Sequence, residues 1–126
     1  GGGELVARSF LQSLADHRLN EPGGIVVLTG MNTFSSAKGN YLTLRKETKM
    51  VSMGQAIRQS ANTLGQVLEF DSPNQKVYCR ISTKHFVRGK EEEKIIRPEI
   101  EIPWRLHDWI KGIDVVLQRA LDYRPK

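Results

Sequence analysis

The chain has 126 residues, of which 39% are hydrophobic and 26% are charged, and it carries a net charge of +5 and one cysteine. These values fit one globular domain that folds without metal, and a single cysteine excludes an internal disulfide. The sequence has no apolar run near the ~20 residues of a membrane span and no signal-peptide pattern in residues 1–10. We therefore expect an intracellular protein with no membrane partner.

The chain is expected to form one domain. Residues 1–3 are all glycine and resemble a cloning remnant or a linker, and residues 4–126 are assigned to a single α+β domain. The single cysteine, Cys79, lies between Tyr78 and Arg80 and is expected to be a small buried hydrophobe. The basic charge favours polyanionic partners, chiefly nucleic acid.

The first third of the chain predicts a helix, a strand and a loop. Apolar residues at helical spacing predict a helix over residues 4–19, which ends at the motif NEPGG: they are Leu5, Phe10, Leu11 and Leu14. Residues 25–28, with the sequence IVVL, predict a short buried strand. Residues 29–40 are rich in turn formers but lack the spacing of a phosphate-binding P-loop.

The middle of the chain predicts a strand followed by a helix. In the motif YLTLRKE, Tyr41, Thr43 and Arg45 alternate with leucines, which is typical of a strand. Residues 52–64 then fit a helix, since Ser52 and Gln55 have the spacing of a capping box.

The last part of the chain predicts two hairpins and a long helix. Strands at 66–70 and 76–83 flank the turn DSPNQ, and a second turn at RGKEEE leads to a strand at 94–102. A helix then begins near Pro103, and its wide apolar face includes Leu106, Trp109, Ile110, Ile113, Val116, Leu117, Ala120 and Leu121. The predicted fold is therefore an antiparallel β-sheet of about four to five strands packed against helices, with a long C-terminal amphipathic helix.

One predicted strand carries most of the functional signal. In KVYCRISTKHF, strand periodicity directs Val77, Cys79 and Ile81 inward. The outward positions alternate basic, aromatic and polar residues, and residues 76–90 contain five basic residues and no acidic one. The outward set is Lys76, Tyr78, Arg80, Ser82, Lys84 and Phe86.

This mixture of side chains suits single-stranded nucleic acid. Lys and Arg neutralise phosphates, while Tyr and Phe stack on unpaired bases at ~1–3 kcal/mol per base. Tyr41, Thr43 and Arg45 repeat the pattern, so two parallel rows are expected if both strands share one face. The alternative is an ordinary solvated or helix-covered sheet face.

The sequence also resembles a known family. The segments KVYCRISTKHFVRGK, EIEIPWRLHDWIKGIDVVLQRAL and AKGNYLTLRKE resemble the single-stranded-DNA-binding family of positive cofactor four and the Whirly proteins over about two-thirds of the chain. The resemblance implies a curved antiparallel sheet that grips single strands and a helix that mediates dimerisation. It assigns binding to Tyr41, Arg45, Tyr78, Arg80, Lys84 and Phe86, and the helix contact to Trp109, Ile113 and Val116.

Catalytic and metal signatures are weak. Asp71, Glu92 and Lys94 loosely resemble the acidic residues and lysine of metal-dependent nucleases. The three histidines lie in separate predicted elements, so no metal site or nucleophilic triad is expected: they are His17, His85 and His107.

We therefore expect a non-enzymatic domain that binds single-stranded DNA or RNA, without a cofactor or metal. The predicted binding residues are Tyr41, Arg45, Lys76, Tyr78, Arg80, Lys84, Phe86 and Arg88. The alternative is a protein-interaction or assembly domain that uses the final helix, at Trp109, Ile113 and Val116, and the acidic turn at 91–93. For the nucleic-acid-binding domain a homodimer is expected, with the helix contact that the resemblance implies, and for the alternative a protein partner is expected on the final helix.

Overall fold

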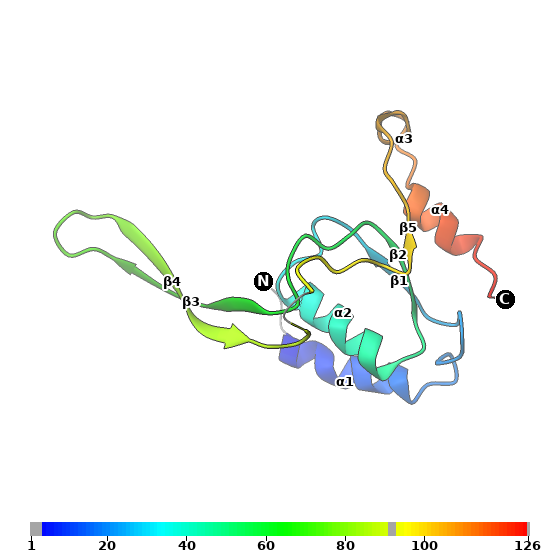
Figure 1. Ribbon diagram of the computed structural model, residues 1–126, viewed down its shortest axis with the longest axis horizontal. Helices are drawn as coiled ribbons and strands as arrows, with labels where there is room; N and C mark the ends of the chain where they lie inside the picture. The colour runs from blue at the N-terminus through cyan, green and yellow to red at the C-terminus, as the bar shows by residue number, and fades with distance from the viewer. Residues whose placement is uncertain (1–3, 91–92, 126) are drawn as a thin grey trace.

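The structure is a computed structural model that describes residues 4–90 and 93–125. A packed body holds α1, α2, α4 and the parallel strands, α3 lies at the tip of a loop that extends from the body, and β3 and β4 form an arm that projects away from it (Figure 1). The elements in chain order are α1 (Glu4–Ala15), β1 (Val26–Thr29), α2 (Ser36–Glu47), β2 (Val51–Gly54), β3 (Thr63–Asp71), β4 (Tyr78–Phe86), β5 (Ile100–Glu101), α3 (Leu106–Ile110) and α4 (Val115–Leu121).

The strands form two separate sheets. In the body, β1, β2 and β5 are parallel in the order β1-β2-β5, and α2 is the crossover between β1 and β2. In the arm, β3 and β4 pair antiparallel from Thr63–Phe86 to Asp71–Tyr78. The α+β class is confirmed, but the predicted antiparallel sheet of four to five strands is wrong. The first helix, the strand near 25–28 and the first hairpin are present as α1, β1 and the arm, although α1 ends at Ala15 rather than at residue 19 and only Thr29 of β1 is buried.

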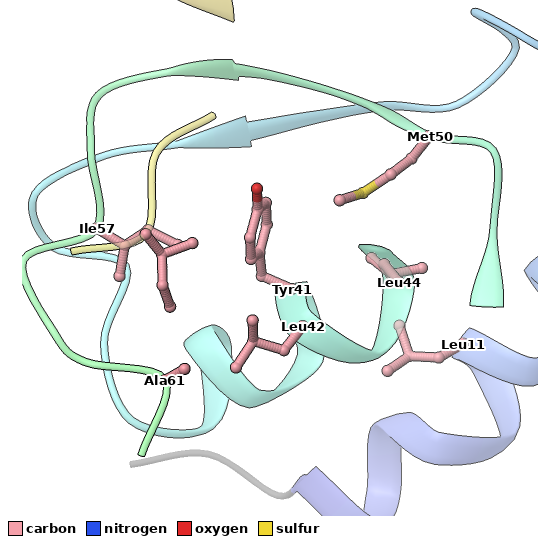
Figure 2. Close-up of a cluster of buried hydrophobic side chains, with 8 residues drawn as sticks. Leu11, Tyr41, Leu42, Leu44, Met50, Ile57 and Ala61 are labelled. Carbon is pink, nitrogen blue, oxygen red and sulfur yellow. The ribbon is translucent and has the colours of Figure 1, made fainter. Parts of the chain in front are cut away.

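The predicted strand at 41–47 is part of helix α2. Its side chains Tyr41, Leu42 and Leu44 are buried and pack with Leu11 of α1 and Met50 (Figure 2). A run of five alternating residues fits the helical period as well as the strand period, and only packing against a neighbour distinguishes the two. The core therefore forms where the sequence predicted a binding face.

The predicted helix at 52–64 begins as strand β2. Because β2 lies between two parallel strands, its residues are buried on both sides and show no alternation: Ser52 is 1% exposed and Met53 is 0% exposed. Ser52 is therefore not a helix cap, and its Oγ accepts hydrogen bonds from the Tyr41 hydroxyl at 3.2 Å and the Glu99 N–H at 3.0 Å. Gly54 has a φ of 127°, and a Cβ there would lie 2.1 Å from the Thr29 carbonyl oxygen.

The predicted long C-terminal helix is divided into α3 and α4. Gly112 has a φ of 65° between them, and the Asp114 side chain caps α4 by accepting the Val116 and Leu117 N–H groups at 3.1 and 2.9 Å. The predicted strand at 94–102 is reduced to β5, while buried Ile96 forms an isolated bridge with Ile57.

Among residues 4–90 and 93–125, no helix is long and apolar enough to cross a bilayer.

Candidate functional site

The two faces of the arm differ in chemistry. Cross-strand partners share a face of an antiparallel pair. One face, here called the basic face, contains five pairs: Thr63–Phe86, Gly65–Lys84, Val67–Ser82, Glu69–Arg80 and Asp71–Tyr78. The opposite face, here called the apolar face, contains three pairs: Leu64–His85, Leu68–Ile81 and Phe70–Cys79.

The predicted binding row of β4 lies on the basic face. Tyr78, Arg80 and Lys84 are exposed there, Lys76 lies in the turn before β4, and Arg88 follows the strand. The prediction that Val77, Cys79 and Ile81 point into a core is wrong, because the arm projects from the body (Figure 1). Val77 and Ile81 are 50% and 52% exposed, and Cys79 is half-buried.

Charges on the basic face are partly paired. Arg80 Nε lies 3.0 Å from Glu69 Oε1, and a hydrogen bond to the same carboxylate raises the pKa of the Tyr78 hydroxyl. Nearer the body, Lys84 Nζ and the Arg88 guanidinium lie 5.1 and 5.0 Å from the centre of the Phe86 ring, within cation–π range. Two cationic side chains therefore flank the Phe86 ring at the end of the arm nearest the body.

The second predicted binding row is not formed. Tyr41 is 3% exposed in the core and cannot stack on a base. Arg45 makes a two-point ion pair with Glu93, at 2.7 and 3.1 Å, and this hydrogen-bonded pairing raises the pKa of the Arg45 guanidinium. Both residues lie on α2 rather than on a strand beside Tyr78.

The three residues of the predicted helix contact also lie on different parts of the structure. Trp109 is 65% exposed on α3, whereas Val116 is buried on α4, which packs against β1 and β2. Ile113 lies between the two helices and is half-buried. These three residues therefore do not form one continuous surface for a partner.

A strained serine lies at the turn from β1 into α2. Ser35 has φ 55° and ψ −118°, immediately before the first residue of α2. A serine in this position normally has extended backbone and caps the helix with its hydroxyl, but the Ser35 side chain makes no capping hydrogen bond. Its N–H instead donates to Gln59 Oε1 at 2.9 Å. A residue other than glycine held at positive φ costs about 1–3 kcal/mol, and such strain is concentrated at functional sites.

Ser35 and the basic face of the arm line one cavity. The cavity has a volume of about 790 Å³ and lies between the start of α2 and the part of the arm nearest the body. Ser35, Ser36 and Gln59 line it from the body, and the arm contributes Arg80, Ser82 and Phe86, among others. Ser35, the first residue of α2 (Ser36) and a cationic residue of the arm therefore line a common space.

Buried Lys38 connects the body to the start of the arm. Lys38 is 1% exposed, and its Nζ donates to the Ser60 carbonyl at 2.9 Å, the Thr63 Oγ1 at 2.9 Å and the Ala61 carbonyl at 3.3 Å. These bonds fix the segment that leads into β3. The Lys38 ammonium thus has a structural role beneath the cavity.

Metal chemistry has little support in the described ranges. Residues 4–90 and 93–125 contain no group of three or more His, Cys, Asp or Glu side chains that could hold a metal ion. Of the nuclease-like residues, Asp71 lies at the far end of β3, while Glu92 is outside the described residues. The acidic turn also lies outside them except for Glu93, which pairs with Arg45.

Sequence analysis missed Ser35 because it assigned 29–40 to a loop and 41–47 to a strand. The available signal was the order of elements: an apolar strand, a short turn that ends in Ser35, and then a helix rather than a second strand. Sites at the carboxyl ends of parallel strands are common in α/β sheets. No family model and no curated protein matches the chain.

Proposed function

We propose that the cavity at the start of α2 is an acyl-transfer site in which Ser35 is the nucleophile. The observation that carries the proposal is the backbone of Ser35, with φ 55° and ψ −118° at a strand-to-helix turn. In hydrolases, a sharp strained turn of this kind presents a serine hydroxyl at the end of a sheet. A reactive Ser35 hydroxyl would explain why the fold keeps this unfavourable backbone conformation.

The chemistry would be hydrolysis of an ester or amide through a covalent intermediate. Ser35 Oγ would attack the carbonyl carbon, and its proton would pass through water to the leaving alcohol or amine as the bond to that group breaks. Water would then cleave the acyl-serine ester. The N-terminal end of α2 would supply positive charge to the oxyanion, whereas Arg80, which also lines the cavity, is ion-paired with Glu69.

The test is covalent labelling of the whole chain with a fluorophosphonate probe, which reports serine reactivity whatever group supplies the base. Intact mass and peptide mapping should show one adduct at Ser35 in the native chain and in Ser36→Ala, and no adduct in Ser35→Ala. Ser36 is a matched control because it lines the same cavity one residue along. No adduct on the native chain, or an adduct at another serine, would contradict the proposal.

A second function is favoured by a separate observation, the exposed row on β4. We propose that the basic face binds single-stranded DNA or RNA. Tyr78 is 59% exposed and alternates with Arg80 and Lys84 on one face of a strand. Tyr78 and Phe86 supply stacking surfaces, and the cations beside them supply phosphate contacts.

This second proposal is tested by fluorescence anisotropy with labelled single-stranded DNA, single-stranded RNA and duplex DNA at two salt concentrations. We expect single strands to bind more tightly, with affinity falling as salt rises. The double variant Tyr78→Ala/Arg80→Ala should bind about tenfold to a hundredfold more weakly. Arg97→Ala removes one positive charge from outside the arm and should bind like the native chain. Equal binding by the arm variant would exclude the basic face.

A further inference from the structure

We propose that the apolar face of the arm packs against the same face of a second copy of this chain. The face carries large aliphatic and aromatic side chains that the described chain leaves uncovered. Leu64, Leu68 and Ile81 are 67%, 57% and 52% exposed, and Phe70 is 41% exposed. The face shares Leu64 with the lining of the cavity, but it does not depend on the proposed function.

The arm lacks the cover that an isolated hairpin needs. A two-stranded hairpin is at best marginally stable in water, and stability requires further strands or a packed face. Here the two strands make their main contacts with each other, and the arm extends away from the body (Figure 1). A nine-residue ladder in each strand is therefore expected to have another surface packed on it.

The size of the face fits a dimer contact. Half-exposed side chains of this kind each present on the order of 100 Å² of apolar surface, so Leu64, Leu68, Phe70, Val77 and Ile81 together present about 500 Å². A patch of this size lies near the upper end of what monomeric proteins expose. Two copies packed face to face would bury about 1,000 Å², which reaches the lower bound for a specific interface.

The chemistry of the apolar face favours the same face of a second copy as its partner. The apolar face has no acidic residue, lysine or arginine in its three pairs, so it is complementary to itself in a two-fold arrangement. Contact through the basic faces would instead bury the charged side chains of Arg80, Lys84, Glu69 and Asp71, which costs desolvation free energy. Packing through the apolar faces directs both basic faces outward.

The test is sedimentation velocity over a concentration series, with matched double variants at neighbouring pairs of the ladder. Leu68→Lys/Ile81→Lys places two charges on the apolar face, while Val67→Lys/Ser82→Lys places the same charges on the basic face. The native chain and the basic-face variant should dimerise, and the apolar-face variant should remain monomeric with an unchanged far-ultraviolet circular dichroism spectrum. A native chain that is monomeric throughout, or a dimer that survives Leu68→Lys/Ile81→Lys, would overturn the proposal.

If Leu68→Lys/Ile81→Lys unfolds, cross-linking through Cys79 tests the same interface. Cys79 is the only cysteine and lies on the apolar face opposite Phe70, so a short bismaleimide should convert the native dimer into a covalent dimer through Cys79. The cross-link should be retained in Trp109→Lys, which charges the exposed surface of α3 instead. Loss of the dimer in Trp109→Lys, or a native dimer that does not cross-link, would place the interface elsewhere.

Discussion

The body and the arm bury their side chains very differently. In the body, Met53, Ile57 and Ile96 are fully buried, and even the polar side chains of Ser52 and Lys38 are almost completely enclosed. In the arm, no residue of β3 or β4 is buried, although each strand is nine residues long. The body therefore holds its own shape, whereas the arm has regular hydrogen bonding without a core.

The body and the arm are therefore suited to different roles. The rigid body can hold Ser35 in an unfavourable backbone conformation, because such strain persists only where the surroundings determine it. The arm provides the outer wall of the Ser35 cavity and two exposed faces of different chemistry.

The largest expected effect is in the core of the body. Ile57 is 0% exposed and packs in the main hydrophobic cluster, so Ile57→Ala should lower the free energy of unfolding by about 2–5 kcal/mol. Val67→Ala on the basic face of the arm, where the side chain is 44% exposed, should cost less than about 1 kcal/mol. Chemical denaturation measures both changes in unfolding free energy. Similar losses for the two variants would show that the body and the arm do not differ in how much their side chains stabilise the fold.

The connection between the two regions depends on Lys38. Lys38→Met keeps the apolar stem but leaves the Ser60 and Ala61 carbonyls without their buried donor. We expect a loss of about 2–3 kcal/mol in unfolding free energy, because hydrogen bonds to a charged group are lost. Amide exchange in residues 60–63 should also become faster. A stability change below about 0.5 kcal/mol would show that the ammonium does not hold this segment.

The strain at Ser35 predicts a gain in stability. Ser35→Gly should raise the free energy of unfolding by about 0.5–1 kcal/mol, because glycine adopts positive φ without a steric penalty. Ser35→Ala keeps a Cβ at the same backbone and should bring no gain, while both variants lose the hydroxyl. Thermal and chemical denaturation distinguish the two, and a glycine variant less stable than the alanine variant would argue against strain.

The smallest effect is a shift in titration on the arm. The pKa of Tyr78 is raised chiefly by its hydrogen bond to the Glu69 carboxylate. Because the folded-state pKa lies above the unfolded one, the resulting stabilisation is complete below the unfolded pKa of about 10 and is lost as pH rises through the folded value. In NMR titrations with labelled tyrosine, Glu69→Gln should lower the Tyr78 pKa. Asp71→Asn, which alters the residue paired with Tyr78, should leave it raised.

Sequence patterns predicted the arm better than the body. The turn DSPNQ fixed the hairpin because its signal is local, and the alternation of β4 correctly grouped Tyr78, Arg80 and Lys84 on one face. The exposure of Ile81 could not be predicted, since alternation identifies two faces without showing which of them is covered.

The elements of the body were harder to predict from the sequence, because contacts with neighbouring elements decide whether a segment there is a strand or a helix. The buried strand β2 shows no alternation, and the Tyr41 segment fits two periods, so only parallel pairing and packing distinguish them. Once 36–47 was assigned incorrectly, the strand-to-helix turn at Ser35 could not be recognised.

Hydrogen–deuterium exchange of the native chain at two concentrations, one below and one above the dimerisation midpoint, tests the contrast between the regions most directly. We predict slow exchange in α2 and β2 at both concentrations, because the body has its own core. Amides of β3 and β4 should exchange rapidly in the dilute sample and slowly in the concentrated one. Arm amides as slow as those of β2 in the dilute sample would contradict the account.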